Sequence, residues 1–157
     1  MQVGARDTRL WRETRGVTLP HRLVFAGESR WWGGGGVAFI DPEPGEATTL
    51  ARAYLITVEQ FQDVLAQESG REVGTEVALG ELRAGGSSIL GDGNYDRVVH
   101  VGEADWPMLT FTTPRAVGEL PLNPPGDAYR DTIVRGVVEA HGLTVADAHR
   151  YVAANHD

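Results

Sequence analysis

The sequence predicts an α+β fold in which strands fill most of the first two-thirds of the chain and helices close it. Short apolar runs separated by glycine, proline and aspartate recur between residues 21 and 112, a pattern that is typical of strands. After residue 126 the apolar residues instead recur every three or four positions, as on one face of a helix. The length of 157 residues suits a single domain, 1–157, whose residues 1–18 are charged and weakly patterned and are predicted to form an irregular arm.

The individual elements are expected where these patterns begin and end. The predicted strands cover residues 21–26, 37–40, 50–56, 95–101 and 108–112. Thr57 and Gln60 form a capping-box pattern, which predicts a helix that runs to about Glu68. The other predicted helices are a short one over residues 76–82, one from Asp127 as its cap to about residue 140, stopped by Gly142, and one from Thr144 as its cap to about residue 154.

The charge balance and the absence of cysteine exclude several classes of protein. The chain has 22 acidic and 14 basic residues, so its net charge is −8, and binding to nucleic acid or to an anionic membrane surface is not expected. Without cysteine there is no disulfide, no thiolate metal site and no cysteine nucleophile. No apolar run approaches the roughly 20 residues that span a bilayer, and residues 1–15 lack the pattern of a signal peptide. A cytoplasmic protein is therefore expected.

Glu68 breaks the apolar pattern of its own helix. Val58, Phe61 and Leu65 follow one another on one stripe. Glu68 is the next position on that stripe. Desolvation and the negative end of the helix dipole both disfavour a charged carboxylate, so a glutamate placed there can accept a proton near neutral pH. The alternative, which periodicity alone favours, is that this last helical residue turns into solvent.

Two blocks of the sequence follow the order of motifs in one enzyme family. The first reads Phe-x-Gly-x-Ser-x-x-Trp-Gly-Gly from Phe25 to Gly34 and continues through an apolar strand, a Pro-Gly turn and a capped helix that ends Glu68-Ser69-Gly70. The second extends from Asn123 to Tyr151 and contains two prolines, Tyr129 and a helix that closes with Gly-x-x-Glu-x-x-Gly-Leu. The matched blocks span residues 19–70 and 123–151, about half of the chain, and in this order they resemble the γ-glutamylcyclotransferase-like family.

The resemblance implies a small mixed β-barrel with packed helices and a cyclotransferase reaction on a small-molecule γ-glutamyl substrate. In that reaction the substrate's α-amine attacks its own γ-carbonyl, 5-oxoproline forms and the attached amine leaves. Because the nucleophile is intramolecular, neither a metal nor a cofactor is expected. The resemblance assigns the acid/base role to Glu68 and substrate binding to Tyr129, Trp32, Gly33 and Gly34.

One part of the family pattern is missing. The family normally begins with a strand that leads into a Tyr-Gly-Ser-Asn loop, whose backbone N–H groups hold the substrate. This tetrapeptide occurs nowhere in the sequence, and the strand before it is not found either. Three explanations stay open: the natural chain begins further upstream, another loop replaces this one, or the activity has been lost. Losing preorganised oxyanion donors costs on the order of 100- to 1,000-fold in rate per donor. The alternative function is therefore a non-catalytic protein that keeps the fold and binds a small molecule or a partner. Without the first strand, one edge of the sheet would be open, and a second copy of the chain could pair with it to form a homodimer.

Other patterns have simpler explanations. The glycines Gly33–Gly36 are not followed by Lys-Ser/Thr and precede a strand, so they do not form a phosphate loop. Asp147 and His149 form an Asp-x-His pair of the kind found among the zinc ligands of arginase-like deacetylases, but a salt bridge on a helix face is expected instead. Three tryptophans are expected to pack in the core or under the arm: Trp11, Trp31 and Trp106.

Overall fold

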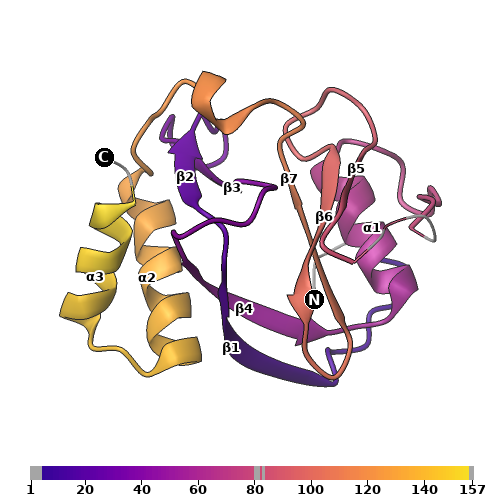
Figure 1. Cartoon of the computed structure of the whole chain (residues 1–157), viewed down its shortest axis with the longest axis horizontal. Helices are drawn as coiled ribbons and strands as arrows, with labels where there is room; N and C mark the ends of the chain where they lie inside the picture. Colours follow the sequence, from indigo (N-terminus) through magenta and orange to yellow (C-terminus); the bar gives the residue numbers. More distant parts are fainter. Residues whose placement is uncertain (1–4, 80–81, 83, 156–157) are drawn as a thin grey trace. The chain divides into compact units, whose positions relative to one another are not determined.

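The chain folds into seven strands and three α-helices in the computed structural model, which describes residues 5–79, 82 and 84–155 (Figure 1). The strands are β1 (Glu13–Leu19), β2 (Leu23–Ala26), β3 (Val37–Ile40), β4 (Thr49–Leu55), β5 (Ser87–Ile89), β6 (Arg97–Glu103) and β7 (Pro107–Thr112). The helices are α1 (Val58–Glu68), α2 (Asp127–His141) and α3 (Val145–Ala154), and one turn of 3-10 helix, η1 (Val117–Glu119), precedes α2. The predicted α+β class is confirmed.

The chain divides into two compact units, each built from two stretches of sequence. Unit 1 combines Met1–Arg15 with Ala53–Pro114, and unit 2 combines Gly16–Arg52 with Arg115–Asp157. Unit 1 therefore contains α1 and the strands β5 to β7, whereas unit 2 contains β2, β3, α2 and α3.

The strands form three small sheets. β1 pairs with β4, β2 pairs with β3 in antiparallel register with Leu23 opposite Ile40, and β6 lies between β5 and β7 with both neighbours antiparallel to it. Among the described residues these ladders do not join into a closed ring. The small mixed barrel expected from the family resemblance is thus not present as a closed barrel in the described residues.

Unit 2 is organised around a buried strand. Every residue of β2 is at most 8% exposed, and the backbone N–H of Asn123 donates to Phe25 O across 3.0 Å at its second edge. Residues of β2, α2 and α3 form one apolar core: Leu23, Phe25, Val134, Val137, Ala148 and Val152. The stripe predicted for α2 is confirmed, since Ile133 and Val138 also pack against this core.

Unit 1 packs α1 on one face of the sheet formed by β5, β6 and β7. The ring centroids of Phe61 in α1 and Phe111 in β7 are 6.4 Å apart, and Phe111 is the cross-strand neighbour of Val98 in β6. Side chains alternate between the two faces of a strand. Val98 therefore shares the face of Phe111, whereas Arg97 and Val99 lie on the opposite face.

The predicted irregular arm is irregular over residues 5–12 but continues as a strand over residues 13–18, and residues 1–4 of it lie outside the described residues. Residues 13–19 form β1, and the N–H of Arg12 donates to Leu55 O across 2.9 Å just before the strand begins. The inward positions of β1 carry small or weakly apolar side chains, which is why its hydrophobic pattern is faint. At Gly16 the absence of a side chain permits close packing, because a Cβ would lie 2.3 Å from Ala140 O.

The helix predicted over residues 76–82 is wrong for the described part of that range, 76–79 and 82, which is irregular backbone. Residues 80 and 81 lie outside the described residues. Gln62 of α1 donates from Nε2 to Val77 O across 3.1 Å, so this segment is held by a side chain and not by a helical ladder. Seven residues between glycines are too few to offset the unfavourable nucleation of a helix.

The capping box predicted for α1 is confirmed, but the predicted apolar stripe is not. The N–H of Gln60 donates to Thr57 Oγ1 across 3.1 Å, and the N–H of Thr57 donates to Gln60 Oε1 across 3.0 Å. Val58 is 66% exposed. The buried residues of α1 are Gln60, Asp63, Leu65 and Ala66. Leu65 of the predicted stripe is therefore buried, but the two polar side chains are buried on another side of the helix.

The ends of α2 and α3 follow the sequence with one exception. Thr144 Oγ1 accepts from the N–H of Asp147 across 3.1 Å as predicted, and Gly142 ends α2 with a left-handed φ of 67°. The N-cap of α2 is Gly126, which makes no side-chain cap bond, and Asp127 is the first helical residue rather than the cap. None of the helices in the described residues is long and apolar enough to cross a membrane.

Replacing Gly35 by alanine tests the close approach of Gly35 to Gly126 in unit 2. A Cβ at Gly35 would lie 2.1 Å from Gly126 N, so Gly35→Ala should lower the free energy of unfolding by about 1–3 kcal/mol, as overpacking does. The matched control is Gly45→Ala, where nothing lies within 4 Å of the new Cβ. Chemical denaturation measures both, and equal stability of the two variants would contradict the packing described.

Candidate functional site

The glycine-rich segment of unit 2 is a compact loop closed by its own hydrogen bonds. Ser29 is 8% exposed, and its Oγ accepts from the N–H groups of Trp31 and Trp32, each across 3.2 Å. The N–H of Ser29 donates to Gly35 O across 2.9 Å, and that of Gly34 donates to Ser29 O across 2.8 Å. Ser29, the serine of the Phe-x-Gly-x-Ser motif, therefore organises this loop, and its hydroxyl oxygen accepts hydrogen bonds from backbone N–H groups.

Asn123 fastens this loop to the segment that precedes α2. Its Nδ2 donates to Gly27 O across 2.8 Å and to Gly34 O across 3.1 Å. The N–H of Gly36 donates to Pro124 O across 2.9 Å. One amide thus holds both ends of the glycine-rich loop, a role that the sequence pattern did not reveal.

Tyr129 and Trp32, predicted as binding residues, lie together in unit 2. Their ring centroids are 5.2 Å apart with planes inclined at 31°, and the Tyr129 ring also meets Phe25 edge to face at 6.4 Å. The Tyr129 hydroxyl oxygen accepts from the N–H of Ala38 across 3.3 Å. Gly33 and Gly34 follow Trp32 in left-handed conformations with φ of 76° and 94°, so these predicted residues form one local cluster.

Glu68 is the last residue of α1, as predicted, and its side chain is half-buried. The helix ends there because Ser69 turns back on it: both its N–H and its Oγ donate to Leu65 O, across 3.0 Å and 2.6 Å. Gly70 follows with a left-handed φ of 69°. Glu68 belongs to unit 1, whereas Tyr129 and the glycine-rich loop belong to unit 2.

A buried ion pair ties the chain just after α1 to the start of β6. Arg71 Nη1 lies 2.5 Å from Asp96 Oδ1, and Arg71 Nη2 donates to Leu90 O across 3.0 Å. Asp96 is 5% exposed, and its Oδ2 also accepts from the N–H of Gly93 across 2.8 Å. Three residues after Glu68, the chain is therefore anchored to the residue that precedes Arg97.

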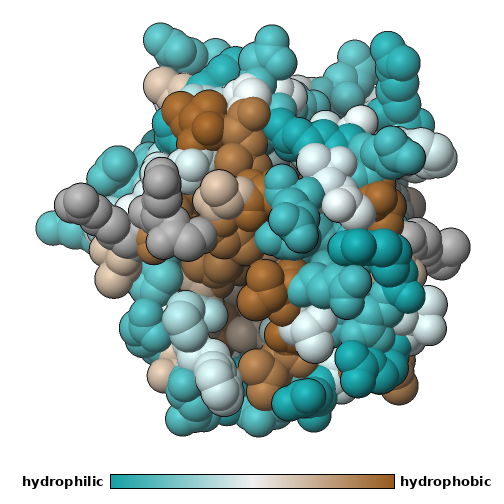
Figure 2. Space-filling view, turned by 90° about the vertical axis from the view of Figure 1, so that its right-hand side faces the viewer, coloured by the Kyte–Doolittle hydropathy of each residue, from teal (hydrophilic) through white to brown (hydrophobic). Residues whose placement is uncertain are grey.

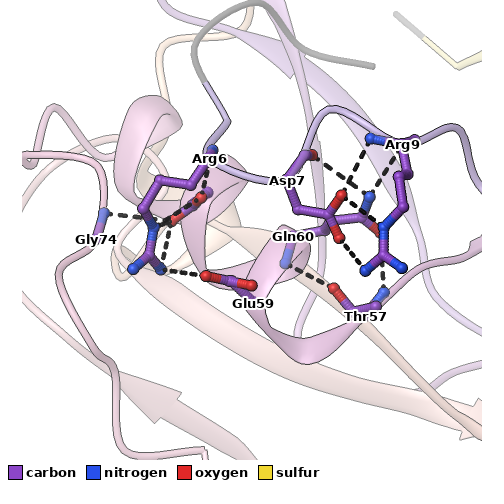
Figure 3. A network of polar contacts seen from close by, with 8 residues as sticks. Arg6, Asp7, Arg9, Thr57, Glu59, Gln60 and Gly74 are labelled. Atoms are coloured by element: carbon purple, nitrogen blue, oxygen red, sulfur yellow. Dashed lines mark hydrogen bonds and ion pairs between the residues drawn. The ribbon is translucent and has the colours of Figure 1, made fainter.

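A second polar network holds α1 from its other side (Figure 3). The Asp63 side chain is 0% exposed, and its carboxylate accepts from the N–H of Arg6 across 2.9 Å, from Arg6 Nε across 3.1 Å and from the N–H of Gly74 across 3.2 Å. The hydrogen bond from the Arg6 side chain lowers the pKa of Asp63 below its ordinary value. Glu59 Oε1 lies 3.5 Å from Arg6 Nη2 at the exposed side of the network.

The chain before β1 also crosses the beginning of α1. Gln60 Nε2 donates to Arg9 O across 2.9 Å, and hydrogen bonding from Arg9 lowers the pKa of Asp7 to about 2. A pocket of about 90 Å³ lies here, lined by Asp7, Arg9, Leu10, Arg12, Ile56, Thr57 and Gln60. It is well below the roughly 300–1,000 Å³ of ordinary small-molecule sites.

The tryptophans are more exposed than predicted. Trp11 packs edge to face on Tyr54 with ring centroids 5.1 Å apart, but Trp31 is 94% and Trp106 is 64% exposed, so packing was wrongly expected of these two. Hydrophobic residues reach the surface in unit 1 as well, with Leu10 at 71%. Figure 2 shows hydrophobic surface, in brown, interrupting an otherwise mostly hydrophilic face.

The salt bridge expected on the helix face is confirmed for Asp147, and its partner is Arg150. Asp147 accepts from the Thr144 hydroxyl across 2.6 Å and pairs with Arg150. The hydrogen bond from Thr144, followed by the charge of Arg150, lowers the pKa of Asp147. Asp147 therefore belongs to the cap of α3, and the described residues contain no group of three or more His, Cys, Asp or Glu side chains that could hold a metal ion.

Several of these polar residues carried weak signals in the sequence. Asp63 lies on one helical stripe with Gln60, and a buried polar stripe looks like a solvated face unless its partners are known. Those partners are distant in the chain, since Arg6 lies 57 residues before Asp63 and Asn123 lies 96 residues after Gly27. Contacts of that kind leave no local periodicity.

Comparison with known proteins gives one partial likeness. Histone deacetylase 5 of Arabidopsis thaliana is 40% identical over 168 residues, which cover 96% of this chain and 25% of the plant protein. The chain thus spans about a quarter of the length of that protein. No family model and no solved structure matches the chain.

Replacing Asp63 by asparagine tests the buried network by its pH dependence. Because the pKa of Asp63 is lowered in the folded state, its contribution to stability is present above the ordinary value of 3.8 and is lost as the pH falls below it. Asp63→Asn should therefore have a clearly lower Tm than the unsubstituted protein at pH 7, with a difference that shrinks below about pH 4.

The control for this measurement is Asp92→Asn, which removes an exposed carboxylate from the turn before β6. Its Tm should follow that of the unsubstituted protein at every pH. A difference for Asp63→Asn that stays constant from pH 7 to pH 3 would show that the lost stability comes from packing and not from the charge of Asp63.

Proposed function

We propose that this chain carries a γ-glutamylcyclotransferase-like domain that converts a γ-glutamyl amine into 5-oxoproline and the free amine. The observation that carries the proposal is the position of Glu68. It is half-buried and ends a capped helix that follows β4, and a left-handed glycine comes two residues later. This is the arrangement around the catalytic glutamate in the family that the sequence resembles.

The cluster in unit 2 supports the same proposal. In the family pattern the Trp-Gly-Gly segment and the tyrosine after the paired prolines belong to the substrate pocket. Here Trp32 stacks on Tyr129 at 5.2 Å, and Asn123 holds the loop that carries Trp32. A rigid aromatic cluster is suited to substrate binding, because little conformational freedom is lost when a ligand contacts it.

The proposed chemistry needs proton transfers and no redox step. The Glu68 carboxylate takes a proton from the substrate's α-ammonium, and the freed amine attacks the γ-carbonyl carbon, which forms the C–N bond of the lactam. The tetrahedral intermediate then expels the amine as its C–N bond breaks. In total two protons leave the α-nitrogen and two reach the leaving nitrogen, so Glu68 returns to its carboxylate form.

Ring closure is favoured because both reacting groups belong to one molecule. Intramolecular reactions of this kind reach effective molarities of about 10⁵–10⁸ M when the groups are well oriented. The protein's task is then to hold the γ-glutamyl group folded on itself and to place the carboxylate beside the α-nitrogen.

The proposal does not include deacetylation. The name of the plant protein refers to its whole chain, and the matched region makes up a quarter of that chain. In the described part of the present chain, no three histidine, cysteine or acidic side chains are grouped as a metal site requires.

The test of the proposal is turnover of a panel of γ-glutamyl amines and γ-glutamyl amino acids, with 5-oxoproline measured by mass spectrometry. Glu68→Gln should lower kcat/KM by about 10²- to 10⁴-fold, because it removes the acid/base group. The matched control is Glu72→Gln, which changes an exposed carboxylate four residues further on and should leave the rate unchanged. Turnover that survives Glu68→Gln would contradict the mechanism.

The exposure of Trp31 favours a second candidate, a non-catalytic binding protein. An indole that is 94% exposed on a closed loop adds nothing to the core, whereas aromatic side chains are enriched where proteins bind partners. Under this proposal the fold is kept, the panel of γ-glutamyl compounds is not turned over, and the loop serves recognition.

Trp31→Ala separates a folding role from a recognition role. Since the side chain is almost fully exposed, the free energy of unfolding should change by no more than about 0.5 kcal/mol. Chemical denaturation provides the measurement, with Phe25→Ala, a fully buried aromatic residue, as the destabilised reference. A loss comparable to that reference would show that Trp31 packs in solution and would remove the observation behind the second candidate.

A further inference from the structure

Four large apolar side chains reach the surface of unit 1 where the chain before β1 meets the end of β4 and the beginning of α1. We refer to these four residues, Leu10, Trp11, Tyr54 and Val58, as the arm surface. Trp11 and Tyr54 are in ring contact, whereas Leu10 and Val58 are the most exposed of the four. Single exposed apolar side chains are ordinary, but a group of them indicates a surface that binds something.

The arm surface adjoins the pocket of about 90 Å³ at the beginning of α1. Leu10 is one of the lining residues, Val58 directly follows Thr57 of the lining, and Tyr54 lies two residues before Ile56 of the lining. One water needs about 10–15 Å³ of such space, so the pocket can hold a single carboxylate group but not a whole metabolite. A ligand that uses both the pocket and the arm surface must therefore extend beyond the pocket.

The charged side chains of the pocket favour an anion. The lining contains two basic residues, Arg9 and Arg12, and one acidic residue, Asp7, so its net charge is +1 in a chain whose net charge is −8. Arg9 Nη2 lies 2.7 Å from Asp7 Oδ2, and Figure 3 shows this pair beside the first turn of α1. Arg9 Nη1 and the whole Arg12 guanidinium have no partner among the described residues. Both arginines thus have donors available to a carboxylate from outside.

We propose that the arm surface and its pocket bind an acidic segment of a partner protein. In this complex an aspartate or glutamate side chain of the partner enters the pocket and meets Arg9 and Arg12, because a guanidinium matches a carboxylate in both charge and geometry. Neighbouring apolar side chains of the partner cover the arm surface. Burial of apolar surface then supplies most of the affinity, and the ion pairs fix the orientation. This interaction does not depend on the proposed reaction.

The first experiment selects peptides from a random dodecapeptide phage library on the immobilised full chain. The enriched peptides should carry aspartate or glutamate next to leucine, isoleucine, phenylalanine or tryptophan. No enrichment, or enrichment of neutral or basic peptides, would overturn the inference.

The second experiment measures the binding of a synthetic copy of the most enriched peptide by fluorescence anisotropy. Arg12→Gln should weaken binding about 5- to 10-fold, between the values for a surface ion pair and for a hydrogen bond to a charged group. Leu10→Ser should weaken it about 10-fold or more, because an apolar contact is lost. Replacing the acidic residue of the peptide by its amide should cost less affinity in Arg12→Gln than in the unsubstituted protein, since both changes remove one contact.

Two matched controls test whether the effects belong to this surface. Arg135→Gln removes an exposed arginine of α2, and Trp31→Ala removes the exposed indole of the glycine-rich loop. Both should bind the peptide with unchanged affinity. Binding that survives both Arg12→Gln and Leu10→Ser, or that is lost in Trp31→Ala, would overturn the inference.

Two measurements without peptide separate recognition from other roles. Because Leu10 and Arg12 are exposed, Leu10→Ser and Arg12→Gln should unfold at nearly the same Tm as the unsubstituted protein. A large loss of Tm would assign these side chains to the fold. In analytical ultracentrifugation Leu10→Ser should leave the sedimentation coefficient unchanged. A dimer that this substitution dissociates would show that a second copy of the chain covers the arm surface, and either result would overturn the inference.

Discussion

The carboxylate of Asp63 is the constraint on which unit 1 depends. A charge on a helix face can be buried only if donors replace the water that it loses, and here Arg6 and Gly74, from the chain before and after α1, supply them. The same helix carries Glu68 at its end. The direction of α1, and with it the place of the proposed acid/base group, is therefore set by polar contacts as much as by apolar packing.

Local patterns in the sequence were sufficient for elements whose stabilising contacts are also local. The capping box of Thr57, the left-handed Gly142 and the apolar stripe of α2 are all decided within a few residues, and each was predicted. β1 and the buried face of α1 were missed because their partners lie far away in the chain. The helix over residues 76–82 was predicted from composition, but in the described part of that range no local contacts stabilise a helix. The barrel was expected from the resemblance to a family, and the motifs that carry the resemblance do not determine whether the strands close into a barrel.

The candidate site shows the same division. Its residue types could be read from the sequence, since Glu68, Trp32 and Tyr129 stand in a recognisable order. The residues that hold them could not, because Asn123 and Asp96 act through hydrogen bonds to backbone groups with no sequence pattern.

The interleaving of the two units has a consequence for synthesis on the ribosome. β2 is an apolar strand near the start of the chain, but the residues of α2 and α3 that bury it in unit 2 are translated about a hundred residues later. At roughly 5–20 residues per second, Leu23 and Phe25 stay without their core for several seconds. During that interval the nascent chain exposes an apolar segment that can aggregate. We therefore expect chaperones to bind the first half of the molecule during synthesis.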